Sequence, residues 1–409
     1  SQMGGGSPVL RGFEASRIVL VVDGVRLNNL IYRAGHLQNI LSLDNNSLER
    51  VEVLFGPSST MYGSDALGGV VHLYTKSPKF AHSNEKMNLK VDAFTRFGSA
   101  NDEFTGHVDV NIGGKKIASF TSITASNFGD LRGGENQNPF YDGEYGVRPT
   151  YVETFNGVDS LVKNDDRYLQ VQSAYQQLDI IQKFLYKQNE RTTHGLNVQL
   201  STTSDIPRYD RLTDPDGAGL RNAEWYYGPA DRFMVAYDFN QKRETGFFRR
   251  IHAGVNMQSV EESRHQRRFV RTGLQHRIEN VNVLGANIDL QHIATRHVVN
   301  FGMDAQLQSL ISTAEEENIE TGETEPLDTR YPDGDNSMMN IAVYFSHQWR
   351  INDHLTLTDG ARIGISSLKS TFEDTTFFKL PYREVNQNNT VYSGSIGFIH
   401  IPNDDLKFT

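Results

Sequence analysis

The chain has 409 residues, which is enough for two or three ordinary domains or for one very large sheet. Its hydrophobic content of 37% and mean hydropathy of -0.50 leave no apolar run of the roughly 18 to 20 residues that a membrane helix requires. A membrane β-strand shows only alternate residues to lipid, so this composition does not exclude a membrane barrel. The net charge of -10 argues against a nucleic-acid partner, and the lack of cysteine excludes disulfides, thiolate metal sites and thiol catalysis.

Three strand-like segments open the chain. RIVLVVDGVRL (17–27) is a continuous β-branched run that ends in a tight D-G turn. LERVEVLFG (48–56) alternates with period 2, and GGVVHLYTK (68–76) is a third strand. Between the first two, NILSLDNNS suggests a short helix or turn that is capped by Asp44 or Asn45. These segments predict a small α/β unit.

The order of these segments carries a specific resemblance. SPVLRGFEASRIVLVVDGVRL followed by LERVEVLFGPSSTMYGSDALGGVVHLYTK resembles the plug domain of TonB-dependent outer-membrane receptors over nearly all of residues 7–78. The resemblance implies a globular plug seated in a barrel of 22 strands, in the outer membrane of a Gram-negative bacterium. It also implies nutrient import that draws energy from a TonB-type inner-membrane partner. In the G-P-S-S loop, glycines allow close backbone approach and serines supply hydrogen bonds, so the loop can pack on a hydrated wall: Gly56, Gly63, Gly68, Gly69, Ser58, Ser59 and Ser64.

The remaining residues alternate as barrel strands do. FTGHVDVNI (104–112), HVVNFGMDAQL (297–307) and NIAVYFSHQW (340–349) each separate an apolar face from a polar one. Short turns and long polar connections follow each other along the chain, which predicts one end of the sheet that carries the recognition loops. The short turns are expected at 113–116, 187–193, 240–246, 293–297, 351–354 and 403–405, and the long connections at 127–166, 203–229, 262–276, 313–337 and 372–388.

The expected fold is therefore a transmembrane antiparallel β-barrel with a small α/β plug domain at the N-terminus. About twelve full strands and the start of a thirteenth are predicted, against the family norm of 22, so the chain is expected to be a fragment. Residues 1–80 are expected to form the C-terminal part of the plug, and residues 81–409 the N-terminal part of the barrel.

The loop after the first turn holds the predicted metal ligand. In plugs of the haem-transporting branch, a G-H-L sequence in this place supplies an axial haem ligand, so the resemblance implies that His36 binds haem iron with Tyr32 and Arg33 beside it. The alternative is a polar loop histidine that only hydrogen-bonds its neighbours.

A second candidate ligand site lies in residues 205–232. Its aromatic rings and guanidinium groups suit a flat or anionic iron complex, and they come from Tyr209, Trp225, Tyr226, Tyr227, Arg208, Arg211 and Arg221. The alternative is an aromatic girdle at the membrane interface with a solvated loop. The basic run at 263–271 is predicted to contact lipopolysaccharide or a phosphate-bearing ligand, or only solvent, and the acidic run at 313–325 is predicted to be solvated.

Charged residues of the N-terminal unit are expected to pair with the barrel wall, as the resemblance implies. They are Arg11, Arg26, Glu49, Arg50 and Glu52, and the alternative is that they form ordinary surface salt bridges.

The predicted function is energy-coupled uptake of an iron complex. Haem or haem-protein iron is preferred and a ferric siderophore comes next; the alternatives are cobalamin, an oligosaccharide, or a surface adhesin that does not transport. The chain has no G-x-S-x-G, H-E-x-x-H or Walker sequence, so neither catalysis nor a resident cofactor is expected. The expected partners are the iron complex, the coupling protein, outer-membrane lipid and lipopolysaccharide, and no nucleic acid.

Overall fold

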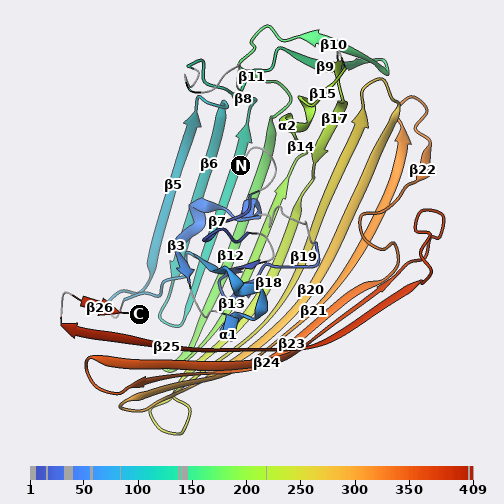
Figure 1. The fold of residues 1–409 in the computed structure, drawn as a ribbon. Coiled ribbons are helices and arrows are strands. Elements are labelled where there is room, and N and C mark those ends of the chain that lie inside the picture. Colours follow the sequence, from blue (N-terminus) through green and yellow to red (C-terminus); the bar gives the residue numbers. More distant parts are fainter. Residues whose placement is uncertain are drawn as a thin grey trace.

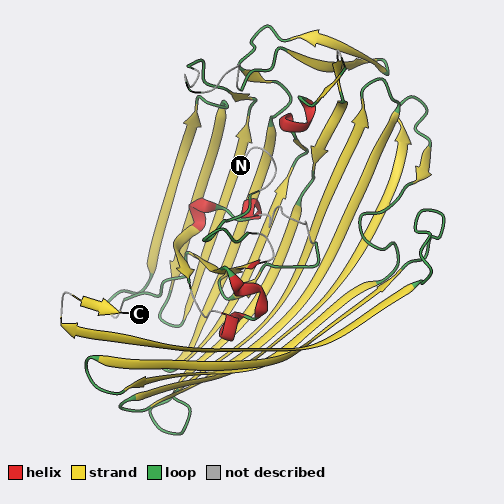
Figure 2. Cartoon of the chain, viewed as in Figure 1, coloured by secondary structure: helices red, strands yellow, loops and turns green. Residues whose placement is uncertain are grey.

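A computed structural model describes residues 6–14, 17–31, 40–55, 59–82, 84–136, 140, 146–217, 219–403 and 406–408. One long antiparallel sheet curves into a trough, and a small N-terminal unit lies on its concave side (Figure 1). Strands dominate, and the helices are single short turns (Figure 2). None of the helices in the described ranges has the length and apolarity to cross a membrane.

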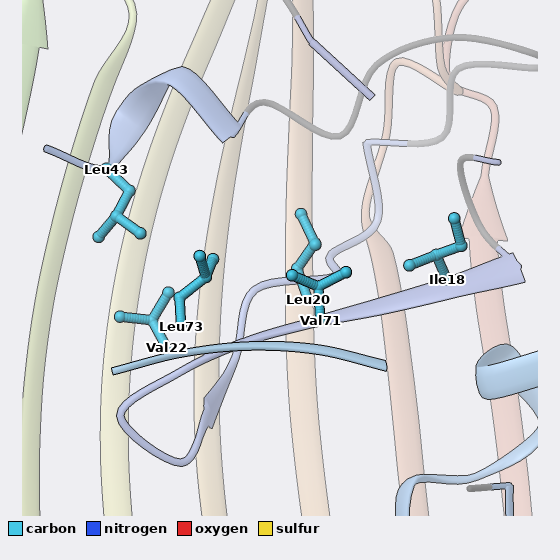
Figure 3. Packing of buried hydrophobic residues seen from close by; sticks show 6 residues of the cluster. All are labelled: Ile18, Leu20, Val22, Leu43, Val71 and Leu73. Carbon is cyan, nitrogen blue, oxygen red and sulfur yellow. The ribbon is translucent and has the colours of Figure 1, made fainter. Parts of the chain in front are cut away.

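The N-terminal unit is built on a four-stranded sheet in the order β2-β1-β4-β3. Its strands are β1 (Ile18–Val22), β2 (Val25–Arg26), β3 (Leu48–Leu54) and β4 (Gly69–Thr75), and β1 runs parallel to β4. Every residue of β1 is buried, because apolar side chains cover both faces of the strand. Figure 3 shows one of the two cores, formed by Ile18, Leu20, Val22, Leu43, Val71 and Leu73. The predicted buried strand and its D-G turn are confirmed.

Short helices join these strands. The 3₁₀ helices are Ile40–Ser42, Asn45–Ser47 and Ser64–Leu67, and α1 is Ser59–Tyr62. The Asp44 carboxylate accepts a hydrogen bond from the Asn46 backbone N–H at 2.9 Å, which confirms Asp44 as a cap. Gly69 has a φ of 134°, and a Cβ there would lie 2.6 Å from the Leu54 carbonyl oxygen, so the close approach needs glycine.

The long sheet contains the strands of the predicted barrel. Its main path runs β5-β6-β7-β12-β13-β18-β19-β20-β21-β23-β24-β25-β26, which confirms twelve long strands and a short thirteenth in the described residues. The bounds are β5 (Asn88–Gly98), β6 (Glu103–Gly113), β7 (Ile117–Phe128), β12 (Tyr175–Asn189), β13 (Thr192–Thr203), β18 (Asp231–Lys242), β19 (Arg250–Arg268), β20 (Gly273–Ile293), β21 (His297–Asn318), β23 (Asn336–Arg350), β24 (Leu355–Thr371), β25 (Glu384–Asn403) and β26 (Leu406–Phe408).

The two faces of this sheet reverse the usual arrangement of a water-soluble protein. On β6, Thr105, His107 and Asp109 point to the concave side and are buried, whereas Val108 and Ile112 on the convex side are 37% and 48% exposed. The same holds along the sheet, where exposed apolar side chains include Ile123, Met257, Leu284, Met303, Leu307, Ile363 and Ile396. An apolar outer face around a polar interior is the pattern of a membrane barrel. We call these faces inner and outer below.

The long connections lie at one end of the trough, where some form two-stranded sheets of their own and others pair with the ends of the long strands (Figure 1). Their elements are β8 (Leu131–Arg132), β9 (Thr150–Phe155), β10 (Val158–Lys163), β11 (Leu169–Gln170), β14 (Ile206–Pro207), α2 (Tyr209–Leu212), β15 (Pro215–Asp216), β16 (Gly219–Leu220), β17 (Asn222–Tyr227) and β22 (Thr324–Pro326). The short turns between β6 and β7, β12 and β13, β20 and β21, and β23 and β24 lie at the other end.

Two predictions about the connections are wrong. Residues 262–276 do not form a long loop: β19 continues to Arg268 and β20 begins at Gly273, with an unbroken antiparallel register between them. The basic run at 263–271 is therefore mostly strand, and part of the acidic run at 313–325 is strand as well, because β21 extends to Asn318. The alternation of long and short connections also fails between β5 and β6, which only residues 99–102 join. Beyond the apolar belt the outer face of β19 is no longer apolar, and residues Ser263–Arg268 are polar on both faces of that strand.

Candidate functional site

The outer ends of β19 and β20 lie above the lipid belt. A membrane strand needs about 9 to 11 residues, and β19 has 19 and β20 has 21. The Gln258 side chain on β19 donates a hydrogen bond to the Arg26 carbonyl oxygen of the N-terminal unit at 3.0 Å. Even-numbered residues of β19 therefore face inward, and this places Arg264 on the inner face above the N-terminal unit.

Arg264 lies among other cations on this inner face. It is the direct cross-strand partner of Arg277 on β20, and like charges directly opposite each other repel. Arg277 is paired with Asp328 at 2.8 Å, and Arg330 is paired with Glu279 at 3.1 Å. Arg264 itself makes no ion pair or side-chain hydrogen bond with any described residue. Burial, and then the charges of Arg330 and Arg277, lower the pKa of Arg264.

Aromatic residues adjoin these arginines. Tyr227 on β17 is the cross-strand partner of Arg264, so its ring lies on the same inner face. The Arg208 guanidinium lies 5.0 Å from the centre of the Tyr227 ring and 5.5 Å from that of Trp225, and the two rings meet edge to face at 4.9 Å. Two hydrogen bonds of 2.8 and 2.7 Å to Asp210 fix Arg208. We call Arg208, Trp225, Tyr227, Arg264, Arg277 and Arg330 the arginine–aromatic cluster.

The structure brings only part of the predicted ligand set into this cluster. Trp225 and Tyr227 belong to it, but Tyr226 points to the other face of β17, where it stacks on His265 at 4.6 Å. Tyr209 begins α2, and Arg211 is half exposed, with its guanidinium 3.7 Å from Asp214. Tyr32, Arg33 and His36 lie outside the described residues. No sequence pattern pointed to Arg277 or Arg330 as ligand residues, and Arg264 was predicted only as part of the basic run at 263–271.

Arg267 has a different role from the one predicted for its basic run. Its side chain is buried and donates to both carboxylate oxygens of Asp159 on β10, at 2.8 and 2.9 Å, and to Glu224 on β17 at 2.7 Å. Burial acts to raise the pKa of Asp159, but hydrogen bonds from Arg267, Thr154 and the Val270 backbone outweigh it and hold that pKa below its usual value. Arg267 therefore fastens the β9–β10 hairpin to the wall and cannot reach lipopolysaccharide.

A second group of polar contacts joins the N-terminal unit to the wall. Asp23, in the turn after β1, pairs with Lys183 of β12 at 2.9 Å and also accepts hydrogen bonds from Asn197 and Gln199. Lys76 pairs with Asp109 of β6 at 2.5 Å. These pairs were not predicted, although the inward position of Lys183 on an alternating strand could have indicated a partner in the plug.

Comparisons with known proteins agree with this architecture. Residues 1–70 match the family of the TonB-dependent receptor plug domain, and residues 117–409 match the family described as TonB dependent receptor-like, beta-barrel. The second match covers most of the chain. The chain belongs to the TonB-dependent receptor family. It is accordingly a protein of the outer membrane of Gram-negative bacteria, with the N-terminal unit as its plug.

Three relatives of this TonB-dependent receptor differ in the ligand that their names give. The Heme/hemopexin utilization protein C of Haemophilus influenzae (strain 86-028NP) is 37% identical over 86 residues, which is 20% of this chain and 11% of that protein. The ferric enterobactin receptor PirA of Pseudomonas aeruginosa is 25% identical over 256 residues, which is 58% of this chain and 33% of that one. The solved structure of the copper transporter OprC superposes with a TM-score of 0.74 at 14% identity, over 98% of this chain and 57% of that chain. This chain thus spans little more than half of the solved structure.

The charged plug residues predicted to bind the wall mostly contact the plug itself in this receptor. Arg26 pairs with Asp65, Arg50 pairs with Glu52 at 2.7 Å, and the Arg11 guanidinium lies 4.6 Å from the centre of the Phe55 ring. Glu49 is exposed. Only the backbone of Arg26 contacts the described wall, through Gln258. Pairing of these side chains with the wall therefore stays a prediction.

Proposed function

We propose that this receptor takes up an anionic iron complex with aromatic rings, haem first and a ferric siderophore second, with energy from a TonB-type inner-membrane protein. The observation that carries the proposal is Arg264, a partly buried cation that makes no ion pair with a described residue and lies near Arg277 and Arg330, with the attraction of Glu279 not offsetting their repulsion. A carboxylate or catecholate group between them would relieve this repulsion, and the partly buried Tyr227 ring, backed by the buried Trp225, offers an aromatic surface beside them.

The names of the relatives support the choice between ligand classes. One relative is named for haem and haemopexin and another for ferric enterobactin, and both ligands are anionic and aromatic. We further propose that residues 1–80 belong to the plug and residues 81–409 to the barrel, since β4 ends at Thr75 and β5 begins at Asn88. Arg268 and Arg271, which are exposed near the β19–β20 turn, are proposed to contact lipopolysaccharide.

Ligand affinity tests the role of Arg264. Replacing Arg264 with glutamine removes the charge, and since a hydrogen bond to a charged group contributes about 1.5 to 3 kcal/mol, affinity for haem or for ferric enterobactin should fall by about 10- to 100-fold. Arg271→Gln makes the same charge change in an exposed turn and should leave the affinity near that of the parent. Equal affinities in the parent and in Arg264→Gln would remove the cluster from the ligand site.

The absorbance spectrum of bound haem tests whether haem is the ligand. Binding of haem shifts its Soret absorbance when a histidine ligates the iron, so a shift in the parent that disappears in His36→Ala would support haem as the ligand and His36 as its axial ligand. If only ferric enterobactin binds, and binds in an Arg264-dependent way, the siderophore is the ligand.

A further inference from the structure

The plug is held strongly on one side of the trough. Strands β6, β7, β12, β13 and β18 all bond to it, and among the described residues β12 and β6 supply ion pairs, Lys183 with Asp23 and Lys76 with Asp109. Further hydrogen bonds join the Thr124 hydroxyl to the Asp44 carboxylate at 2.6 Å, the Gln177 amide to the Leu41 carbonyl at 2.8 Å and the Arg232 guanidinium to the Ser42 carbonyl at 3.2 Å. We call these strands the anchored wall.

The opposite wall holds the plug by packing and hydrogen bonds and not by ion pairs: α1 lies against β23, β24 and β25, and Leu30 and Ile31 pack against buried apolar residues of β20 and β21. No ion pair joins the plug to β20–β25 within the described part of the chain. Its polar contacts include a hydrogen bond between the hydroxyls of Thr60 and Ser395 at 3.0 Å and bonds to backbone carbonyls, from Arg362 to Met61 at 3.2 Å and from Gln306 to Asn28 at 3.4 Å. The Arg362–Met61 bond has the same kind of donor and the same length as the Arg232–Ser42 bond of the anchored wall, so the two walls differ chiefly in the ion pairs of Lys183 and Lys76.

Two cavities lie beside the plug, one against this opposite wall and one that extends from it across β19 to β18. One, of about 490 Å³, reaches outward to Met338, Ser366 and Asn389 near the outer ends of β23–β25. The other, of about 670 Å³, reaches Lys242 and Arg250 at the end of the short turns. Both are large enough for a small ligand. Both also touch Gly24, Arg26, Asn287 and Asp304, so they adjoin each other at this level of the barrel.

Two arginine–carboxylate pairs stand where the cavities adjoin. Arg26 pairs with Asp65 on the plug, and Arg362 on β24 makes two hydrogen bonds of 2.6 and 2.8 Å to Asp304 on β21. Small residues line the cavity around them, including Gly285 and Gly364. Movement of the plug side of this junction would join the two cavities into one polar passage from the outer end to the short-turn end.

We propose that the substrate crosses the membrane between the plug and strands β20–β24, while the plug stays held to the anchored wall. This inference rests on the proposed uptake function and adds which side of the barrel opens. The anchored wall acts as the hinge side, and the Arg26–Asp65 and Arg362–Asp304 pairs close the passage at rest.

Tethers across the two walls test this proposal, and the chain contains no cysteine that would interfere. The pair Thr60→Cys and Ser395→Cys links the plug to the opposite wall, and the pair Asp44→Cys and Thr124→Cys links it to the anchored wall. Each pair replaces two side chains that are hydrogen-bonded to each other in the structure. Uptake is measured in the protein as its own bacterium encodes it, before and after a short thiol cross-linker. Cross-linking should abolish uptake in the first pair and preserve it in the second. Preserved uptake in the first pair, or its loss only in the second, would overturn the proposal.

A second measurement does not depend on the substrate. A small polar thiol reagent added from outside should label a cysteine at Asn287, in the junction of the cavities, faster than one at Gln199, which is buried on the anchored wall. Equal rates, or faster labelling at Gln199, would contradict the proposed path. If the parent protein imports neither haem nor ferric enterobactin, the proposed function is wrong. The labelling rates still test whether the passage lies between the plug and β20–β24, because they need no substrate.

Discussion

Replacing Lys183 with methionine should weaken the docking of the plug by about 3 kcal/mol, the low end of the cost of breaking a buried ion pair. The side chains of Lys183 and Asp23 are 8% and 13% exposed, and their charged atoms are 2.9 Å apart. Without the lysine, the Asp23 carboxylate stays buried with only neutral donors from Asn197, Gln199 and Thr75. Because these hydrogen bonds still stabilise the Asp23 carboxylate, the expected loss of docking free energy stays at the low end of the range.

Hydrogen exchange of the β1 amides measures this loss. Exchange through local release of the plug should speed up by about 100-fold or more in Lys183→Met, as 3 kcal/mol implies. Lys187→Met is the matched control, because Lys187 lies on the same strand but pairs with the exposed Glu190 at 3.3 Å and lies 5.3 Å from the Phe80 ring, so that its loss leaves no buried carboxylate unpaired. Unchanged protection of β1 in Lys183→Met would show that the ion pair does not hold the plug.

Replacing Ile123 with arginine should destabilise the barrel by about 2 to 4 kcal/mol, the cost of a cation near the bilayer midplane. Ile123 lies in the middle of β7 on the outer face and is 39% exposed there. Ile117 begins the same strand beside the short turn and is 61% exposed. The same substitution at Ile117 should cost only about 0 to 1 kcal/mol, because an arginine at the interface can reach water.

Urea-dependent folding into lipid vesicles measures both variants. The difference between Ile123→Arg and Ile117→Arg isolates the depth in the membrane, since the residue type, the strand and the face are the same. Equal small effects at both positions would mean that the outer face of β7 meets water and not lipid.

The architecture was predictable from sequence because its physical signals are local. Alternation with period 2 showed which residues of 104–112 face inward, and the structure confirms Thr105, His107 and Asp109 as buried. The prediction that the basic run at 263–271 lies in a loop was wrong for a related reason. Where a strand leaves the lipid belt, its outer face no longer needs apolar residues, so Ser263–Arg268 has the composition of a loop although it is paired in β19.

The members of the site could not be predicted from short stretches of sequence, because strand register and contacts between distant segments bring them together. Arg264 and Arg277 face each other only because β19 and β20 pair without a break around a four-residue turn, and a predicted loop across 262–276 hid that register. Asp23 and Lys183 are 160 positions apart, and no local pattern joins a plug turn to a barrel strand. The composition of residues 205–232 did identify Trp225 and Tyr227 correctly as neighbours of arginine, because aromatic residues and arginine are dense there.

The most direct test of the central claim is the depth and direction of single side chains on β21. In the cysteine-free chain, a fluorophore attached to cysteine at Met303 or Leu307 should be quenched by a nitroxide on the lipid acyl chains, because both side chains are exposed on the outer face. A fluorophore at Gln306, whose amide contacts the plug, should not be quenched. Equal quenching at all three positions, or none at any of them, would contradict a barrel wall that meets lipid on one face and the plug on the other.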